Sequence, residues 1–131
     1  MVATDAERPT VHLHIDSFYV WIRTGFGGYA RGGYDVLLDG VVGPWALQPF
    51  RDAAERDGLD LYYVVLRPSL DVTLARGTAR DATELTDVEP LTGMHAAFVG
   101  LGELEPHVID TSEQSVEETA DAVRDRAAFA L

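Results

Sequence analysis

The sequence predicts an α/β protein with an open parallel sheet that carries helices on both faces. Apolar runs of strand length alternate with segments of helical periodicity, as they do in a doubly wound sheet. Three of the predicted strands end in an aspartate, at Asp16, Asp39 and Asp110. We expect residues 1–10 to be a polar N-terminal segment and residues 11–131 to form a single α/β domain.

The composition excludes several classes of function. The 131 residues include no cysteine, so disulfides, zinc–thiolate sites and thiol nucleophiles are ruled out. The net charge of −12 disfavours nucleic acid and anionic membrane surfaces as partners. No apolar run is long enough to span a bilayer and the start is polar, so we expect a cytoplasmic protein.

The first half of the chain predicts two strands and the helices that follow them. Val11–Asp16 alternates apolar and polar residues, and a short helix from Phe18 to about Arg23 follows it. Five glycines between residues 25 and 33 predict a loop, and Tyr34–Asp39 reads as a buried strand. A helix then runs from Trp45 to Arg56, or begins nearer Gln48 because of Pro49, and Gly58 ends it.

The second half predicts two more strands and three helices. The clearest strand is Leu61–Leu66, which Arg67-Pro68 ends, and Ser69 caps a helix to about Arg80. Residues 81–90 are polar and read as irregular. A helical spacing follows at Leu91, Met94, Phe98 and Leu101, and His107–Asp110 is the fourth predicted strand. The last predicted helix begins at a capping box of Ser115 and Glu118. Its apolar face consists of Val116, Ala120, Val123 and Ala127.

The strand-end aspartates are the first candidates for chemistry. Each has an ordinary interpretation as a cap of the next turn or helix, which is strongest for Asp110 because Thr111 and Ser112 follow it. Because parallel strands share a carboxyl edge, we expect Asp16 and Asp39 to face one cleft. Their mutual repulsion would raise the pKa of at least one.

Two arginines are candidates for binding an anion. Arg76 and Arg80 are four residues apart on a predicted helix and would share a face, which suits a phosphate clamp. The alternative is solvated charge paired with nearby acids such as Asp71. His12 and His14 form an H-x-H pair, but with no third ligand beside them we expect no metal site.

Four segments together resemble a known family. They are Val11–Tyr19, Tyr34–Trp45, Tyr63–Pro68 and His107–Thr111. In this order they are similar to the P-loop kinase-like ATPases, often labelled AAA-family ATP-binding proteins, which include chloramphenicol-phosphotransferase-like and nucleotide-kinase-like small-molecule kinases. The likeness runs from about Val11 to Ala130.

The resemblance implies roles for individual residues. Asp16 would orient or deprotonate the acceptor hydroxyl, and Asp39 would lie near magnesium or substrate. Arg76 and Arg80 would be lid arginines that neutralise the transferred phosphoryl group. Asp110 and Thr111 would belong to the loop beside the adenine. The implied cofactors are ATP and magnesium, and the implied partner is a small-molecule acceptor.

The sequence departs from the family in one decisive respect. All ten basic residues are arginine, so there is no lysine for a G-x-x-x-x-G-K-[ST] phosphate loop. We therefore expect a P-loop NTPase-like sheet that lacks the first strand and phosphate loop. The expected protein is a truncated nucleotide-dependent phosphotransferase by lineage, with weak or no activity. The alternative is a non-catalytic α/β module that binds a partner or assembles into a homo-oligomer.

Overall fold

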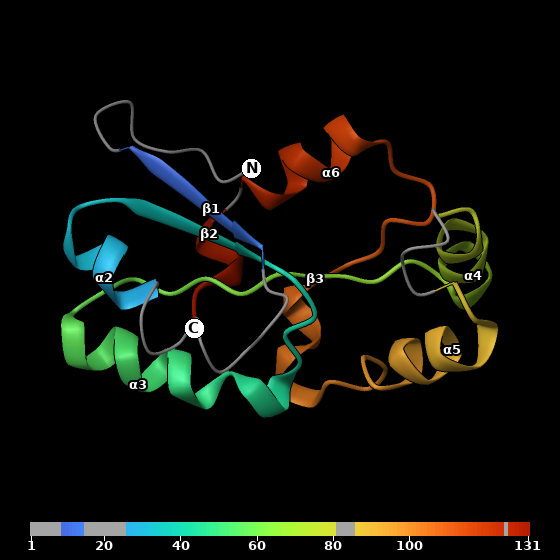
Figure 1. Cartoon of the computed structure of the whole chain (residues 1–131), viewed down its shortest axis with the longest axis horizontal. Helices are drawn as coiled ribbons and strands as arrows, with labels where there is room; N and C mark the ends of the chain where they lie inside the picture. The colour runs from blue at the N-terminus through green and yellow to red at the C-terminus, as the bar shows by residue number, and fades with distance from the viewer. Residues whose placement is uncertain (1–8, 15–25, 81–85, 125) are drawn as a thin grey trace. The chain divides into compact units, whose positions relative to one another are not determined.

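The computed structural model of the chain describes residues 9–14, 26–80, 86–124 and 126–131. These residues form a mixed α/β protein with two small parallel sheets (Figure 1). They fall into two compact units, one containing the described residues up to Tyr63 together with Val123–Leu131, the other containing Val64–Ala122. Across the described ranges, no helix is long and apolar enough to cross a membrane.

The first unit is built on the parallel pair of β1, Thr10–His14, and β2, Asp35–Asp39. Val11 lies opposite Val36 and Leu13 opposite Leu38. Both predicted strands are confirmed at these residues, and the parallel pairing agrees with the predicted α/β class. Residues 15 to 25, which include the predicted helix after β1, lie outside the described residues.

Helix α3, Gln48–Asp57, covers this sheet (Figure 1). A short 3-10 turn, η1 at Pro44–Ala46, leads into it. The helix begins at Gln48, and Gly58 ends it with a φ of 63°, as the positions of Pro49 and the glycine predict. Its apolar face forms the core of the unit, in which Phe50 and Ala53 are buried against Val36, Leu38, Val42 and Leu61.

The predicted glycine loop is wrong in part, because Phe26–Arg31 forms helix α2. The backbone of the helix end explains this result. Gly33 has a φ of 88°, and its N–H donates to the Ala30 carbonyl, while the Tyr34 N–H reaches back to the Tyr29 carbonyl. This is the Schellman pattern, completed by an edge-to-face contact of the Tyr29 and Tyr34 rings. The glycines therefore end a short helix that packs on β2 and α3.

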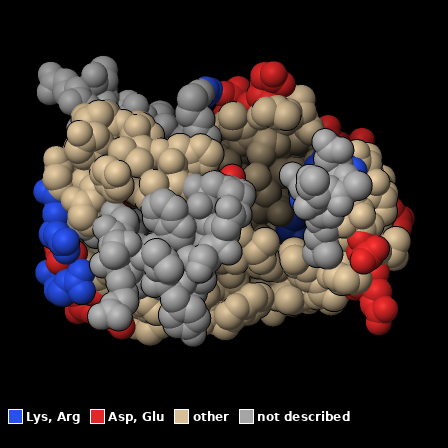
Figure 2. All heavy atoms as spheres, viewed as in Figure 1, with Lys and Arg blue, Asp and Glu red and all other residues tan. Residues whose placement is uncertain are grey.

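An ion-pair cluster joins the ends of α2 and α3. The Asp57 carboxylate accepts from Arg31 at 2.9 Å and from Arg56 at 2.8 Å and 2.9 Å. Figure 2 shows basic side chains gathered at the left of the view, where α2 and α3 lie. The Asp57 side chain is only 9% exposed, whereas both arginine side chains are more than half exposed.

The predicted strand Leu61–Leu66 is divided between the two units. In the first unit, Tyr62 pairs antiparallel with Ala130, the Tyr63 N–H donates to the Phe129 carbonyl and the Leu131 N–H donates to the Leu61 carbonyl. These partners are the last residue of the 3-10 turn η3, Arg126–Phe129, and the two residues after it. Val64 and β3, Val65–Leu66, belong to the second unit.

The second unit contains the parallel pair of β3 and β4, Val108–Ile109. The described residues thus form two two-stranded sheets in place of the predicted single four-stranded one. Both strands are short for local reasons. Pro68 cannot donate to a ladder after β3, and a side-chain turn at Asp110 follows β4.

Between β3 and β4, the described residues of this unit form two helices and a 3-10 segment. Helix α4, Leu70–Thr78, packs against α5, Val88–Ala96, where Gly77 lies close to Leu91. Ser69 caps α4 through the Val72 N–H, as predicted. Helix α5 begins within the segment predicted as irregular, and Phe98 and Leu101 lie beyond its end. Residues 81–85 lie outside the described residues, and η2, Gly102–His107, leads into β4.

The capping box of α6, Val116–Val123, is confirmed. The Glu118 N–H donates to Ser115 Oγ at 3.1 Å, and the Ser115 N–H donates to the Glu118 carboxylate at 2.7 Å. Two details of the predicted apolar face are wrong, because Ala127 lies beyond the end of α6, in η3, and Val116 is 81% exposed. As the first residue of the helix, it lies beside the cap.

Candidate functional site

The carboxyl edge of the β3–β4 pair carries a hydrogen-bonded polar cluster. The Ser69 N–H, at the start of α4, donates to Ser112 Oγ at 2.8 Å. Ser112 in turn donates its hydroxyl and its N–H to Asp110 Oδ1, at 2.5 Å and 2.9 Å. These bonds hold the pKa of the Asp110 carboxyl below its ordinary value, the Ser112 hydroxyl contributing most. The residues after the two strands are thus connected to each other.

Arg76 lies at the same edge. From the last turn of α4, its guanidinium donates to the Thr111 carbonyl at 3.0 Å and to Thr111 Oγ1 at 3.4 Å. Thr111 is 5% exposed and Arg76 is exposed. The structure therefore brings Arg76, Asp110 and Thr111, three of the residues predicted to bind a cofactor, to one edge of one sheet.

Arg80 does not share a helix face with Arg76. Helix α4 ends at Thr78, so Arg80 lies beyond it. The Arg80 N–H donates back to the carbonyl of Gly77 in the last turn. The prediction of two arginines on one helical face is wrong because the helix is shorter than predicted. Arg76 is the arginine that the helix itself presents to this edge.

Arg67, directly after β3, was not predicted as part of a site. It forms a two-point ion pair with the Glu105 carboxylate, both contacts at 3.0 Å, and donates to the Phe98 carbonyl at 2.7 Å. The hydrogen bonds from Arg67 lower the pKa of Glu105 to about 2, with help from the Leu101 N–H. Thirty-eight residues separate the two partners, so no local pattern could have indicated the pair. Arg67 orders the chain between α5 and β4.

Neither predicted catalytic carboxylate belongs to the described polar cluster: Asp39 is in the first unit, and Asp16 lies outside the described residues. Asp39 ends β2 in the first unit, where its carboxylate lies 3.7 Å from His12 Nε2. Both side chains are more than half exposed. Asp16 lies outside the described residues, so its sharing of a cleft with Asp39 stays a prediction. Within the described ranges, no three His, Asp or Glu side chains are grouped so that they could hold a metal ion.

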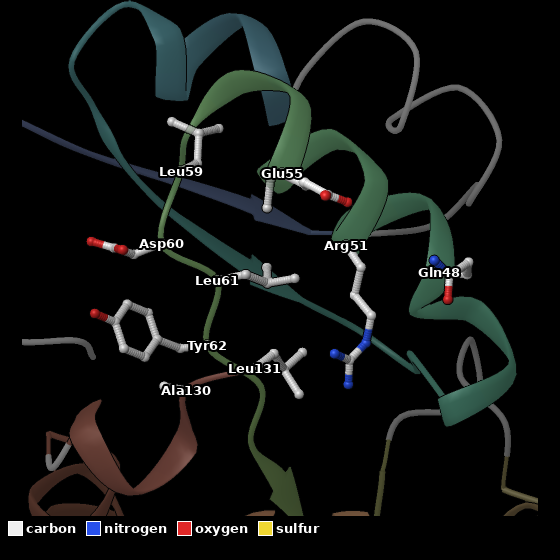
Figure 3. A pocket seen from close by; sticks show the side chains of 10 residues that line it. Gln48, Arg51, Glu55, Leu59, Asp60, Leu61, Tyr62, Ala130 and Leu131 are labelled. Carbon is white, nitrogen blue, oxygen red and sulfur yellow. The ribbon is translucent and has the colours of Figure 1, made fainter.

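A pocket of about 430 Å³ lies in the first unit and was not predicted. One wall is the face of α3 that carries Gln48, Arg51 and Glu55. The opposite wall consists of the segments Leu59–Tyr62 and Ala130–Leu131, which the backbone bonds described above hold together. Figure 3 shows Arg51 extending from α3 beside Leu61 and Leu131. The sequence signal was the four-residue spacing of Arg51 and Glu55, which on a helix places both on one face.

The sequence was also compared with known proteins. No family model matches the chain, and no curated protein matches it. The residues themselves therefore have to support any proposal about function.

Proposed function

We propose that this protein is by lineage a nucleotide-dependent small-molecule phosphotransferase, and that this chain binds a phosphate-bearing small molecule at the carboxyl edge of β3 and β4. The observation that carries the proposal is the guanidinium of Arg76 beside Thr111, directly after β4. In parallel α/β sheets, ligands bind at the carboxyl ends of strands, and a guanidinium is well suited to phosphate oxygens.

The order of segments along the chain supports the lineage. Strand-end motifs occur at Asp39, Arg67-Pro68 and Asp110-Thr111 in the same sequence order as in P-loop kinase-like ATPases. In this proposal Arg76 supplies the charge that attracts the phosphate, and the Thr111 hydroxyl is a hydrogen-bonding partner. Arg80 adds a second positive charge nearby in the sequence. Asp16 and Asp39 are the proposed acidic groups of the phosphotransferase.

The residues present do not suit a tightly held ATP–magnesium complex. The 131 residues include no lysine to reach the β- and γ-phosphates. In the part of the chain that the structure describes, carboxylates are not clustered for a metal. We therefore propose that phosphoryl transfer by this chain alone is weak or absent and assign no catalytic step to ATP or magnesium.

Titration calorimetry with inorganic phosphate and with ATP plus magnesium tests this proposal. We expect phosphate to bind at millimolar concentrations and Arg76→Ala to weaken binding by roughly tenfold, the usual effect of losing a charged hydrogen bond. Arg124→Ala, which removes an exposed arginine from another segment, should leave binding unchanged. Equal binding by Arg76→Ala and the unaltered protein would refute the site. Micromolar binding of ATP with magnesium would refute the weak-nucleotide part.

A second candidate is a non-catalytic module that assembles with itself. It is favoured by exposed apolar side chains between β2 and α3, where Val41 is 59% and Trp45 67% exposed. Light scattering across a range of protein concentrations tests it. A constant monomer mass for the unaltered protein would exclude this candidate.

A further inference from the structure

The pocket beside α3 contains three charged side chains. Arg51, Glu55 and Asp60 line it, and all three are exposed. Among the described residues, the Arg51 guanidinium makes no hydrogen bond or ion pair. Other described arginines do, as Arg31, Arg56, Arg67 and Arg76 show. Arg51 is therefore available to a ligand.

The rest of the lining is apolar. Ala54 is buried, and Leu59, Leu61 and Leu131 are half-buried along the pocket. In Figure 3, Arg51 lies beside Leu61 and Leu131, whereas the polar ends of Asp60 and Tyr62 point away from it. The pocket thus combines a positive group, negative groups and a hydrocarbon surface, which is the usual composition of a small-molecule site.

The charges decide which ligand chemistry fits. Arg51 contributes one positive charge, while Glu55 and Asp60 contribute two negative ones, in a protein of net charge −12. A phosphate dianion would gain one partner and be repelled by both carboxylates, and a simple amine would leave Arg51 without a partner. A molecule with both a carboxylate and an ammonium group satisfies both kinds of side chain.

We propose that this pocket binds a small zwitterion with an aliphatic body, that is, an aliphatic α-amino acid or a compound of the same chemistry. Arg51 holds the carboxylate, Glu55 holds the ammonium group, and the aliphatic part lies on Leu61 and Leu131. The pocket volume of about 430 Å³ is ample for such a molecule. This site is separate from the phosphate site proposed above and does not depend on it.

The test uses three probes of matched shape with the full chain. They are leucine, 4-methylpentanoate, which lacks the amine, and 3-methylbutylamine, which lacks the carboxylate. Calorimetry at low salt should show leucine binding at least roughly tenfold more tightly than either probe, because each loses one charged contact. Equal binding of leucine and 4-methylpentanoate would overturn the zwitterion assignment, and so would no heat from leucine at millimolar concentration.

Variants then locate the site. Arg51→Gln and Glu55→Gln should each weaken leucine binding, Arg51→Lys should retain most of it, and Glu89→Gln on α5 should have no effect. Backbone amide shifts of the unaltered protein give a second measurement that does not depend on any variant folding. Leucine should move the signals of Gln48, Leu61 and Leu131. Shifts confined to other residues, or full binding by Arg51→Gln, would overturn the proposal.

Discussion

Arg76 and Thr111, thirty-five residues apart in the chain, are joined by two hydrogen bonds, and the shorter one, of 3.0 Å, goes to the Thr111 backbone carbonyl. This contact ties the last turn of α4 to the residue that follows Asp110. It also means that an anion arriving at Arg76 would compete with a carbonyl for the same guanidinium. The strength of the contact can therefore be measured through both stability and binding.

Arg76→Ala and Thr111→Val should change the free energy of unfolding by different amounts. Arg76→Ala should lower the free energy of unfolding by about 0.5–1 kcal/mol, because a partly exposed hydrogen bond is lost. The coupling between Arg76→Ala and Thr111→Val in a double-mutant cycle should stay below about 0.5 kcal/mol, because the main acceptor is the backbone carbonyl, which Thr111→Val keeps. Urea unfolding of the four proteins is the measurement. A larger coupling energy would show that the hydroxyl is the main partner.

Stability should depend on the ionisation of Asp57. Hydrogen bonds from Arg56, and then from Arg31, lower the pKa of this carboxyl from 3.8 to about 2, against an opposing effect of burial. Because the folded-state pKa is the lower one, the contribution is complete above the unfolded value and is lost as the pH falls from 3.8 towards about 2.

The matching variant is Asp57→Asn, which removes the charge and keeps the shape. It should be less stable than the unaltered protein at neutral pH, and the difference should shrink as the solution is acidified through the window named above. Thermal unfolding at a series of pH values measures this, with the exposed Asp60→Asn as the control. A difference that stays constant down to the lowest pH would show that the ion pairs add nothing to stability.

Two glycines in neighbouring helices should respond in opposite ways to alanine. At Gly93 in α5, an added Cβ meets no atom within 4 Å, so Gly93→Ala should stabilise by about 1 kcal/mol through helix propensity. At Gly77 in α4, the same Cβ would lie 2.6 Å from Leu91 Cδ1, and Leu91 is buried. Overpacking there should outweigh the gain and give a net loss of about 1 kcal/mol.

Chemical unfolding of these two variants measures the difference. Each variant is the control for the other, because both replace a glycine by alanine in an α-helix. If Gly77→Ala were as stabilising as Gly93→Ala, the close packing of α4 on Leu91 would be disproved.

Tyr63 should contribute through its hydroxyl. This group donates to the Val42 carbonyl at 2.7 Å, and burial raises the pKa of the phenol. Tyr63→Phe should cost about 1 kcal/mol, because it leaves a partly buried carbonyl without this donor. The neighbouring Tyr62 is 39% exposed, and Tyr62→Phe should be close to neutral. Equal costs for the two variants, measured by thermal unfolding, would count against the hydrogen bond.

Local signals in the sequence were sufficient for much of the secondary structure. The stop of α3 at Gly58, the Ser69 cap and the Ser115–Glu118 box each depend on groups within about four residues, so the sequence contains the whole interaction. The turn at Asp110, the ordinary interpretation of that aspartate, is confirmed for the same reason, because its partner Ser112 is two residues away.

Other features depended on partners that no local pattern contains. The predicted strand Leu61–Leu66 was divided because its first half pairs with residues near 130. The Arg67–Glu105 pair likewise joins distant segments.

The sequence by itself determined the α/β class, the alternation of elements, both ends of α3 and the starts of α4 and α6, because propensity and capping act over a few residues. Tertiary structure alone decided that the parallel strands form two small sheets, which arginines are paired, and that Arg51 is left facing a pocket. Those outcomes depend on contacts between segments far apart in the chain, whose geometry exists only after the backbone has folded.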